Sequence, residues 1–138
     1  YLDLSNNKFT GPMTSFCMPE NLTNLDLSGN CLNGIIPSSH FEGLYNLAYV
    51  YLSHNVFTGS IPSSLFTLTS MQWILLDHNQ LNQLDKFINE TSILHILDLG
   101  SNNISGPFPA PVLQLTTLSV LKLSSNKFNE SVQLNKLF

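Results

Sequence analysis

Hydrophobic and polar positions recur along this chain with a period of 23 to 25 residues. Each period carries two large aliphatic residues two positions apart, then an asparagine, then another apolar residue two positions after the asparagine. The asparagines are Asn7, Asn30, Asn55, Asn79, Asn102 and Asn126. The aliphatic pairs that precede them are Leu2/Leu4, Leu25/Leu27, Val50/Leu52, Ile74/Leu76, Leu97/Leu99 and Leu121/Leu123. Self-similarity at such a period predicts a solenoid of stacked units with one continuous core.

Within each period, the spacing of two between aliphatic residues predicts a short strand with those side chains inward. Stacking the strands gives a parallel sheet on the concave side of the solenoid. The asparagine then turns the chain, and its amide offers two donors and an acceptor to backbone groups that the turn leaves unpaired. We therefore expect the six asparagines to form a buried polar ladder.

The second half of several periods reads Gly, any residue, an apolar residue and Pro, at 34–37, 59–62 and 106–109. Glycine permits a bend that other residues resist, and proline interrupts regular hydrogen bonding. The segment that follows, such as 63–68, suits a 3₁₀ or irregular helical turn on the convex side. Gln83 and Glu130 stand where glycine belongs, so those two repeats are predicted to be locally irregular.

The frame L-x-L-x-x-N-x-L is that of the leucine-rich repeat. Its longer form, with Ser before the turn and Gly-x-Ile-Pro after it, resembles the plant-specific extracellular leucine-rich repeat, and residues 44–62 follow that form almost column by column. The resemblance implies a leucine-rich repeat solenoid of α/β-type repeat architecture. A single array of about six repeats would occupy residues 1–138, with short parallel concave strands and a 3₁₀ or irregular convex side.

At finer grain, residues 78–87 and 121–129 resemble plant receptor-like proteins of the Verticillium-wilt-resistance type. Those are membrane-anchored immune receptors with a large repeat ectodomain and no kinase. The resemblance implies a ligand-recognition ectodomain fragment that acts in pathogen perception and defence signalling at the extracellular side of the plasma membrane. Its partners would be a protein or peptide ligand and a co-receptor kinase. Two alternatives stay open: a secreted inhibitor of microbial cell-wall-degrading enzymes, and the ectodomain of a leucine-rich repeat receptor kinase.

Composition narrows the classes of function. Charged residues are only 10% of the chain, the net charge is −4 and no basic run exists, so nucleic acid is not an expected partner. No apolar stretch approaches the ~18 residues of a membrane span, so contact with a membrane is expected only through parts outside this chain. The chain starts and stops inside a repeat without polar caps, which predicts a fragment uncapped at both ends. Neither a credible Ser-His-Asp arrangement nor a glycine-rich phosphate loop is present, so we expect no enzyme and no cofactor.

The concave face is the first candidate binding site. Columns of outward-facing residues should run across the strands, because neighbouring strands lie only ~4.8 Å apart. One column, expected to be exposed, reads Asp3, Asp26, Tyr51, Leu75, Asp98 and Lys122; the other reads Tyr1, Asn24, Tyr49, Trp73, Ile96 and Val120. Their centre is an apolar and aromatic patch formed by Tyr49, Tyr51, Trp73, Leu75 and Ile96, and such patches mark interaction sites. The alternative is that these rings only cover the sheet or meet another part of the parent protein. Asp3 and Asp26 are expected to serve solubility.

Two histidines form a second candidate site. His54 and His78 each precede a ladder asparagine in adjacent repeats, with Asp77 beside them. Two imidazoles and a carboxylate can ligate zinc, and imidazoles can also sense pH. We expect instead a pair of polar residues at the rim of the sheet, and no metal.

Sequons and cysteines complete the candidates. Four Asn-x-Ser/Thr sequons give Asn21, Asn89, Asn103 and Asn129 as candidate glycosylation sites in an extracellular protein. Asn103 and Asn129 fall in turns after the ladder and the other two on the convex side, so the concave face should stay free of glycan. Cys17 and Cys31 are expected to be unpaired thiols, with a mutual disulfide as the alternative.

Overall fold

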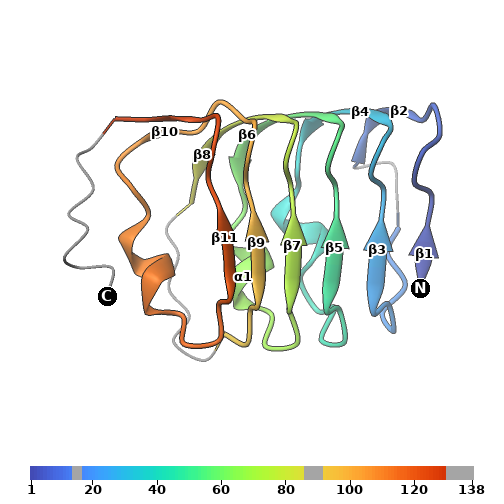
Figure 1. Cartoon of the computed structure of the whole chain (residues 1–138). Coiled ribbons are helices and arrows are strands. Elements are labelled where there is room, and N and C mark those ends of the chain that lie inside the picture. The colour runs from blue at the N-terminus through green and yellow to red at the C-terminus, as the bar shows by residue number, and fades with distance from the viewer. Residues whose placement is uncertain (14–16, 86–91, 130–138) are drawn as a thin grey trace.

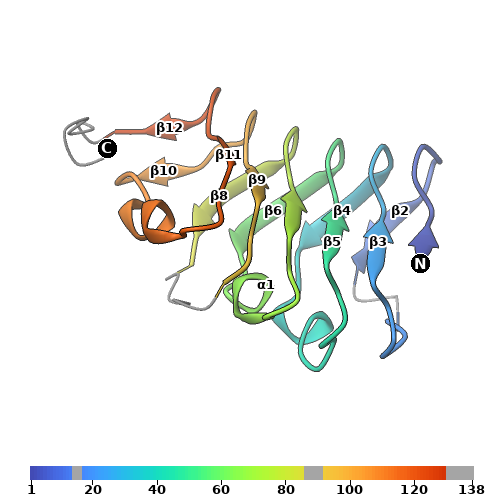
Figure 2. The same ribbon diagram turned by 60° about the horizontal axis from the view of Figure 1, so that its bottom comes forward.

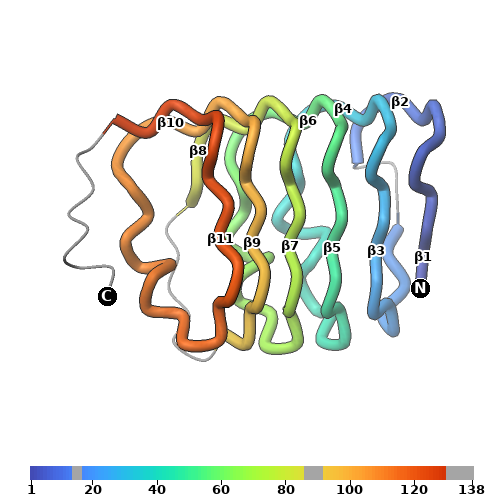
Figure 3. Tube along the Cα trace, in the orientation of Figure 1, coloured from blue at the N-terminus to red at the C-terminus, as the bar shows by residue number. Residues whose placement is uncertain are grey.

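A computed structural model describes residues 1–13, 17–85 and 92–129. Its main element is a six-stranded parallel sheet in which the strands follow one another in chain order, one from each repeat (Figure 1). The chain coils once between successive strands, as the trace in Figure 3 shows. The strands are β1 (Leu2–Asp3), β3 (Asn24–Asp26), β5 (Tyr49–Tyr51), β7 (Trp73–Leu75), β9 (Ile96–Asp98) and β11 (Val120–Lys122). The predicted leucine-rich repeat solenoid is confirmed.

The strand register keeps equivalent residues of successive repeats side by side. Leu25 pairs with Val50, Val50 with Ile74, and Ile74 with Leu97, and all four side chains are fully buried. A shift of one residue would turn every one of these side chains to solvent, so the burial of the aliphatic pairs fixes the register.

The asparagine ladder joins consecutive repeats. The Asn55 amide nitrogen donates to the Leu52 carbonyl of its own repeat at 3.2 Å and to the Leu27 carbonyl of the previous repeat at 2.9 Å. Its amide oxygen accepts the Leu32 N–H at 3.0 Å. The same pattern recurs at Asn30, Asn79 and Asn102, which are buried. The prediction of six buried members was wrong at two positions: Asn7 is exposed and Asn126 half-buried, because the described residues give each of them a neighbouring repeat on one side only.

A second set of parallel strands follows the turn after each concave strand (Figure 2), and the sequence pattern did not predict it. Four of these strands form one sheet and the remaining two form another. They are β2 (Thr10–Pro12), β4 (Cys31–Ile35), β6 (Val56–Ile61) and β8 (Gln80–Leu84), followed by β10 (Ser105–Gly106) and β12 (Lys127–Phe128).

The fourth repeat interrupts this second set. The β6–β8 register shifts between Gly59 and Ser60, so that Asn82 is an extra residue in β8. Beyond it the sheet ends, although the Asn103 N–H still donates to the Leu81 carbonyl at 2.8 Å. The irregularity predicted from Gln83 is therefore confirmed, whereas Glu130 lies outside the described residues.

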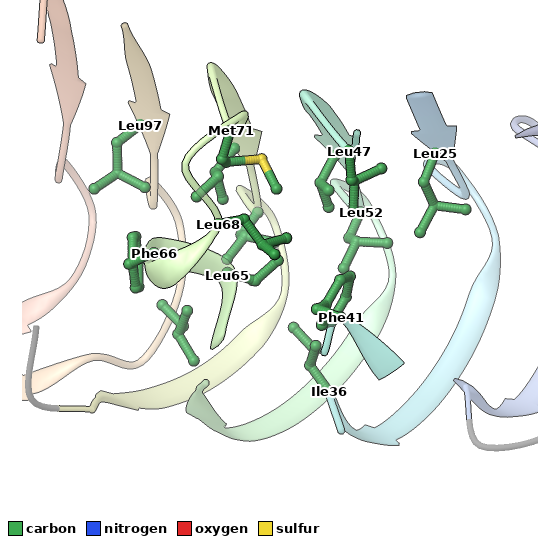
Figure 4. Close-up of a cluster of buried hydrophobic side chains, with 14 of the residues drawn as sticks. Leu25, Ile36, Phe41, Leu47, Leu52, Leu65, Phe66, Leu68, Met71 and Leu97 are labelled. Atoms are coloured by element: carbon green, nitrogen blue, oxygen red, sulfur yellow. The ribbon is translucent and has the colours of Figure 1, made fainter. Parts of the chain in front are cut away.

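Short helical turns cover the convex side. Two 3₁₀ turns lie wholly within the described residues, η2 (Ser38–His40) and η3 (Ala110–Gln114), as expected. The third, α1 (Ser64–Thr67), is a single α turn in place of the predicted 3₁₀ or irregular one, since the Thr67 N–H reaches the Ser63 carbonyl at 3.2 Å. Figure 4 shows Leu65 and Phe66 of α1 among the buried side chains behind the concave strands, with Phe41, the residue directly after η2, near Leu52. The core is thus a continuous apolar layer between the two sides.

Candidate functional site

The strand register brings the five predicted residues of the concave face together. Tyr49, Trp73 and Ile96 are consecutive partners across β5, β7 and β9. Tyr51 and Leu75 pair in the same way, two residues further along β5 and β7. We call these five residues the aromatic patch.

Ring contacts fix the shape of the aromatic patch. The Trp73 ring stands edge-on to Tyr49, with centroids 5.6 Å apart and planes at 80°, and edge-on to Tyr51 at 6.5 Å and 84°. The Tyr49 hydroxyl donates to the Gln72 side-chain oxygen at 3.3 Å. Trp73 is 37% exposed while the other four residues are half-buried. The rings therefore form a pre-arranged apolar surface whose most accessible member is an indole, a favoured anchor for protein contacts.

The environment of Tyr51 is less hydrated than open solvent. Burial raises the pKa of its phenol, and the nearby Tyr49 and Asp26 groups raise it further. A phenol that resists ionisation stays a neutral donor and contact surface over the physiological range.

Asp26, in the strand next to the aromatic patch, and Asp3, one strand further away, have structural roles that were not predicted. Asp26 accepts the Ser28 N–H at 2.9 Å and the Ser28 hydroxyl at 2.6 Å, and Asp3 accepts the Ser5 N–H at 2.9 Å. These bonds hold the turn that follows each of the two strands, and the expected role in solubility stays a prediction. Interactions with the side chain and the backbone N–H of Ser5 lower the pKa of Asp3.

Asp98 departs from the expected exposed column. It is 8% exposed, accepts the Gly100 N–H at 3.0 Å and forms an ion pair with Lys122 at 3.1 Å. The expectation of an exposed side chain was wrong here because Lys122, in the adjacent strand, covers the carboxylate. The far side of the aromatic patch is therefore bounded by a neutralised pair.

His54, Asp77 and His78 meet at the end of the same strands, as predicted. The imidazole rings stack with centroids 4.2 Å apart and planes at 13°. His78 Nδ1 lies 2.8 Å and His54 Nε2 3.8 Å from Asp77 Oδ2, and the Ser53 hydroxyl donates to Asp77 Oδ1. Burial raises the pKa of Asp77, but the hydrogen bonds from Ser53 and His78 outweigh it, so the net pKa is lowered.

One feature of the two histidines was missed from the sequence. Both have positive φ, 55° for His54 and 54° for His78, as do the residues directly before the asparagine in the other repeats. These are Asn6, Gly29, Ser101 and Ser125. The mixture of residue types at this position gave no sequence signal for a left-handed turn, because only glycine and asparagine favour it strongly.

The remaining candidates are placed as follows. Asn21, Asn103 and Asn129 are exposed and lie off the concave strands, so glycosylation there stays a prediction, and Asn89 lies outside the described residues. Cys17 and Cys31 are exposed, unpaired thiols.

A hollow of about 790 Å³ was also missed. It opens where β8 and β10 fail to pair, and its apolar lining includes Leu84, Phe108 and Phe128. The one sequence signal for this hollow was Gln83, which replaces the glycine found at this position in other repeats.

Among the described residues, no helix is both long enough and apolar enough to cross a membrane.

Comparisons with known proteins agree with this architecture. A family model described as Leucine rich repeat matches residues 20–81, and a second leucine-rich repeat model matches residues 1–18 and 94–115. Receptor-like protein 32 of Arabidopsis thaliana is 37% identical over 132 residues, which cover 94% of this chain and 15% of that protein. The chain thus spans about one seventh of the length of this relative.

Solved structures give the same picture. The leucine-rich repeat ectodomain of the Arabidopsis receptor kinase HAESA, in complex with an extended IDA peptide hormone, superposes with a TM-score of 0.83 at 34% identity. That match covers 93% of this chain and 22% of the other. The complex of Arabidopsis HAESA with IDA and the co-receptor SERK1 matches with a TM-score of 0.75 at 31% identity, over 91% of this chain and 21% of that one. Repeat frame, asparagine ladder and matches together show that the chain belongs to the leucine-rich repeat family.

Proposed function

We propose that this chain contributes to the ligand-recognition ectodomain of a plant cell-surface receptor-like protein, and that the aromatic patch binds a protein or peptide ligand. The observation that carries the proposal is the arrangement of Tyr49, Tyr51 and Trp73 on a rigid parallel sheet. An exposed indole supported by two edge-on phenols loses little conformational entropy on binding, because its partners already hold it in place. The same apolar surface supports a role in binding.

Relatives support the setting of this proposal. Receptor-like protein 32 shares the repeats, and the HAESA ectodomain is solved with a peptide hormone and with a co-receptor. By analogy, the parent protein would act in pathogen perception and defence signalling at the extracellular side of the plasma membrane, together with a co-receptor kinase. The ectodomain of a receptor kinase is the second candidate, because HAESA itself is a receptor kinase.

Selection from a display library of random peptides tests the binding role. Peptides enriched on the intact chain should lose about tenfold or more of their affinity when Trp73 is replaced by alanine, because an indole at the centre of a contact is a typical hot spot. Tyr45→Ala is the matched control, since Tyr45 is 78% exposed and lies in the loop before β5, off the concave face. Enriched peptides that bind Trp73→Ala as well as the native chain would contradict the proposed site.

A further inference from the structure

Three side chains that follow β5 and β7 form a cluster that the turn itself does not need, since the other repeats make the same turn without it. His54, Asp77 and His78 each offer a ligand atom, and these atoms all lie within 4.8 Å of one another. We propose that this histidine cluster binds a divalent transition-metal ion, with Zn²⁺ as the redox-inert representative.

Ligand spacing supports a shared ion. Tetrahedral Zn²⁺ with bonds of about 2.0–2.1 Å places its ligand atoms about 3.3 Å apart. The two contacts to Asp77 Oδ2, 2.8 Å from His78 Nδ1 and 3.8 Å from His54 Nε2, fall on either side of that value. Both imidazoles are more than half exposed, so solvent leaves room for the side-chain adjustments that would bring the three atoms to the required distances.

The donor set selects the class of metal. Two imidazole nitrogens and one carboxylate oxygen suit Zn²⁺, Cu²⁺ or Ni²⁺, whereas Ca²⁺ and Mg²⁺ prefer oxygen ligands throughout. A cation at the edge of the two rings would be bound by one nitrogen of each imidazole together with the negatively charged carboxylate. Three protein ligands leave a coordination position open to water or to a group from a bound partner.

Asp77 is held in position by a neighbouring repeat. The Ser53 hydroxyl donates to Oδ1 of Asp77, which leaves Oδ2 directed at the histidines. Outer contacts of this kind orient metal-binding carboxylates in proteins. The arrangement therefore includes both the ligands and a support for one of them.

Comparison of the repeats shows that the cluster is a departure from the common frame. The position of Asp77 is otherwise serine or glycine: Ser5, Ser28, Ser53, Gly100 and Ser124. The position of His54 and His78 is held elsewhere by residues with the same positive φ and no imidazole. The turn therefore requires neither the carboxylate nor the imidazoles, although all three occur together in adjacent repeats.

The location joins the cluster to the aromatic patch. Tyr51 and Leu75 end β5 and β7, and Ser53 and Asp77 follow them two positions later. A metal ion at the histidine cluster would thus lie beside the proposed ligand-binding surface. The metal site does not depend on that proposed function, because its ligands are separate residues.

Titration calorimetry of the intact chain, free of any histidine tag, with ZnCl₂ tests the proposal. We expect one Zn²⁺ per chain, with binding abolished by His54→Asn or His78→Asn and strongly weakened by Asp77→Ser. These substitutions insert residues that the frame already uses at the same positions, as in Asn6 and Ser53, so the turn is expected to survive. Ser53→Ala should weaken binding by about tenfold, in the range seen for supporting contacts at metal sites.

His95→Ala is the matched control, because His95 is an exposed histidine in the next repeat, outside the cluster. It should bind Zn²⁺ like the native chain, and all variants should keep a single cooperative urea transition. Absence of Zn²⁺ binding to the native chain, or binding that persists in both His54→Asn and His78→Asn, would overturn the proposal.

Discussion

Replacement of Asn55 by alanine probes the ladder that joins the repeats. The substitution removes four interactions: the bond that its oxygen accepts from the Leu32 N–H and the three that its nitrogen donates to the Leu27, Leu52 and Ser53 carbonyls, the last of them long at 3.4 Å. The residue is 7% exposed, so water has little access to replace them.

The cost is unequal among the groups left behind. The Leu27 carbonyl still accepts from Asn30 and the Leu52 carbonyl from Asn79, so each keeps one partner. Losing a second bond at each carbonyl costs about 0.5–1 kcal/mol. The Leu32 N–H has no other partner among the described residues, and a buried unpaired donor costs about 1–3 kcal/mol. Together the free energy of unfolding should fall by about 3 kcal/mol.

Urea denaturation followed by circular dichroism measures the change, with Asn7→Ala as the control. Asn7 is exposed and its nitrogen bonds only the Leu4 and Ser5 carbonyls of its own repeat. Water can replace those bonds, so the control should lose less than about 1 kcal/mol. Equal losses of unfolding free energy for the two variants would show that neither burial of Asn55 nor its bond to the neighbouring repeat sets the cost.

Three further changes test other features. Gly59→Ala should lower the free energy of unfolding by about 2 kcal/mol, measured by urea denaturation, because φ is 76° and the new Cβ would lie 3.0 Å from Ile35. Tyr51→Phe should reduce the loss of stability above pH 10 in urea midpoints measured across pH. The raised pKa of Tyr51 means that the unfolded state releases its proton first, so rising pH favours unfolding of the native chain. Lys122→Met should destabilise the chain by about 1 kcal/mol, by thermal or urea unfolding, because it leaves the largely buried Asp98 carboxylate without its cation.

The sequence predicts those parts of the fold that follow from aligning equivalent positions of successive repeats. The aliphatic pair fixes the inward side of each strand, and equal spacing then aligns Tyr49 with Trp73 and His54 with His78. The composition of the aromatic patch and of the histidine cluster follows from that alignment alone. The relative orientation of the rings could not be predicted from the sequence, because it depends on side-chain torsion angles.

Other features were beyond the pattern for physical reasons. The second sheet depends on backbone pairing between segments such as 31–35 and 56–61, whose side chains do not alternate in a way that marks a strand. The burial of Asp98 depends on how the long Lys122 side chain folds back over the neighbouring strand. Both are set by contacts across repeats, not by local preference.

The sharing of each ladder carbonyl by two asparagines has a consequence for how such arrays diversify. Every junction uses the same donors and acceptors, such as Asn55 on Leu27 and Asn79 on Leu52, and none of them involves the residues that face outward from the concave strands. A repeat of regular frame could therefore be duplicated, deleted or exchanged by recombination with its ladder bonds preserved. Outward-facing residues such as Trp73 are free to vary at each exchange, so new binding surfaces can arise while the scaffold is inherited unchanged.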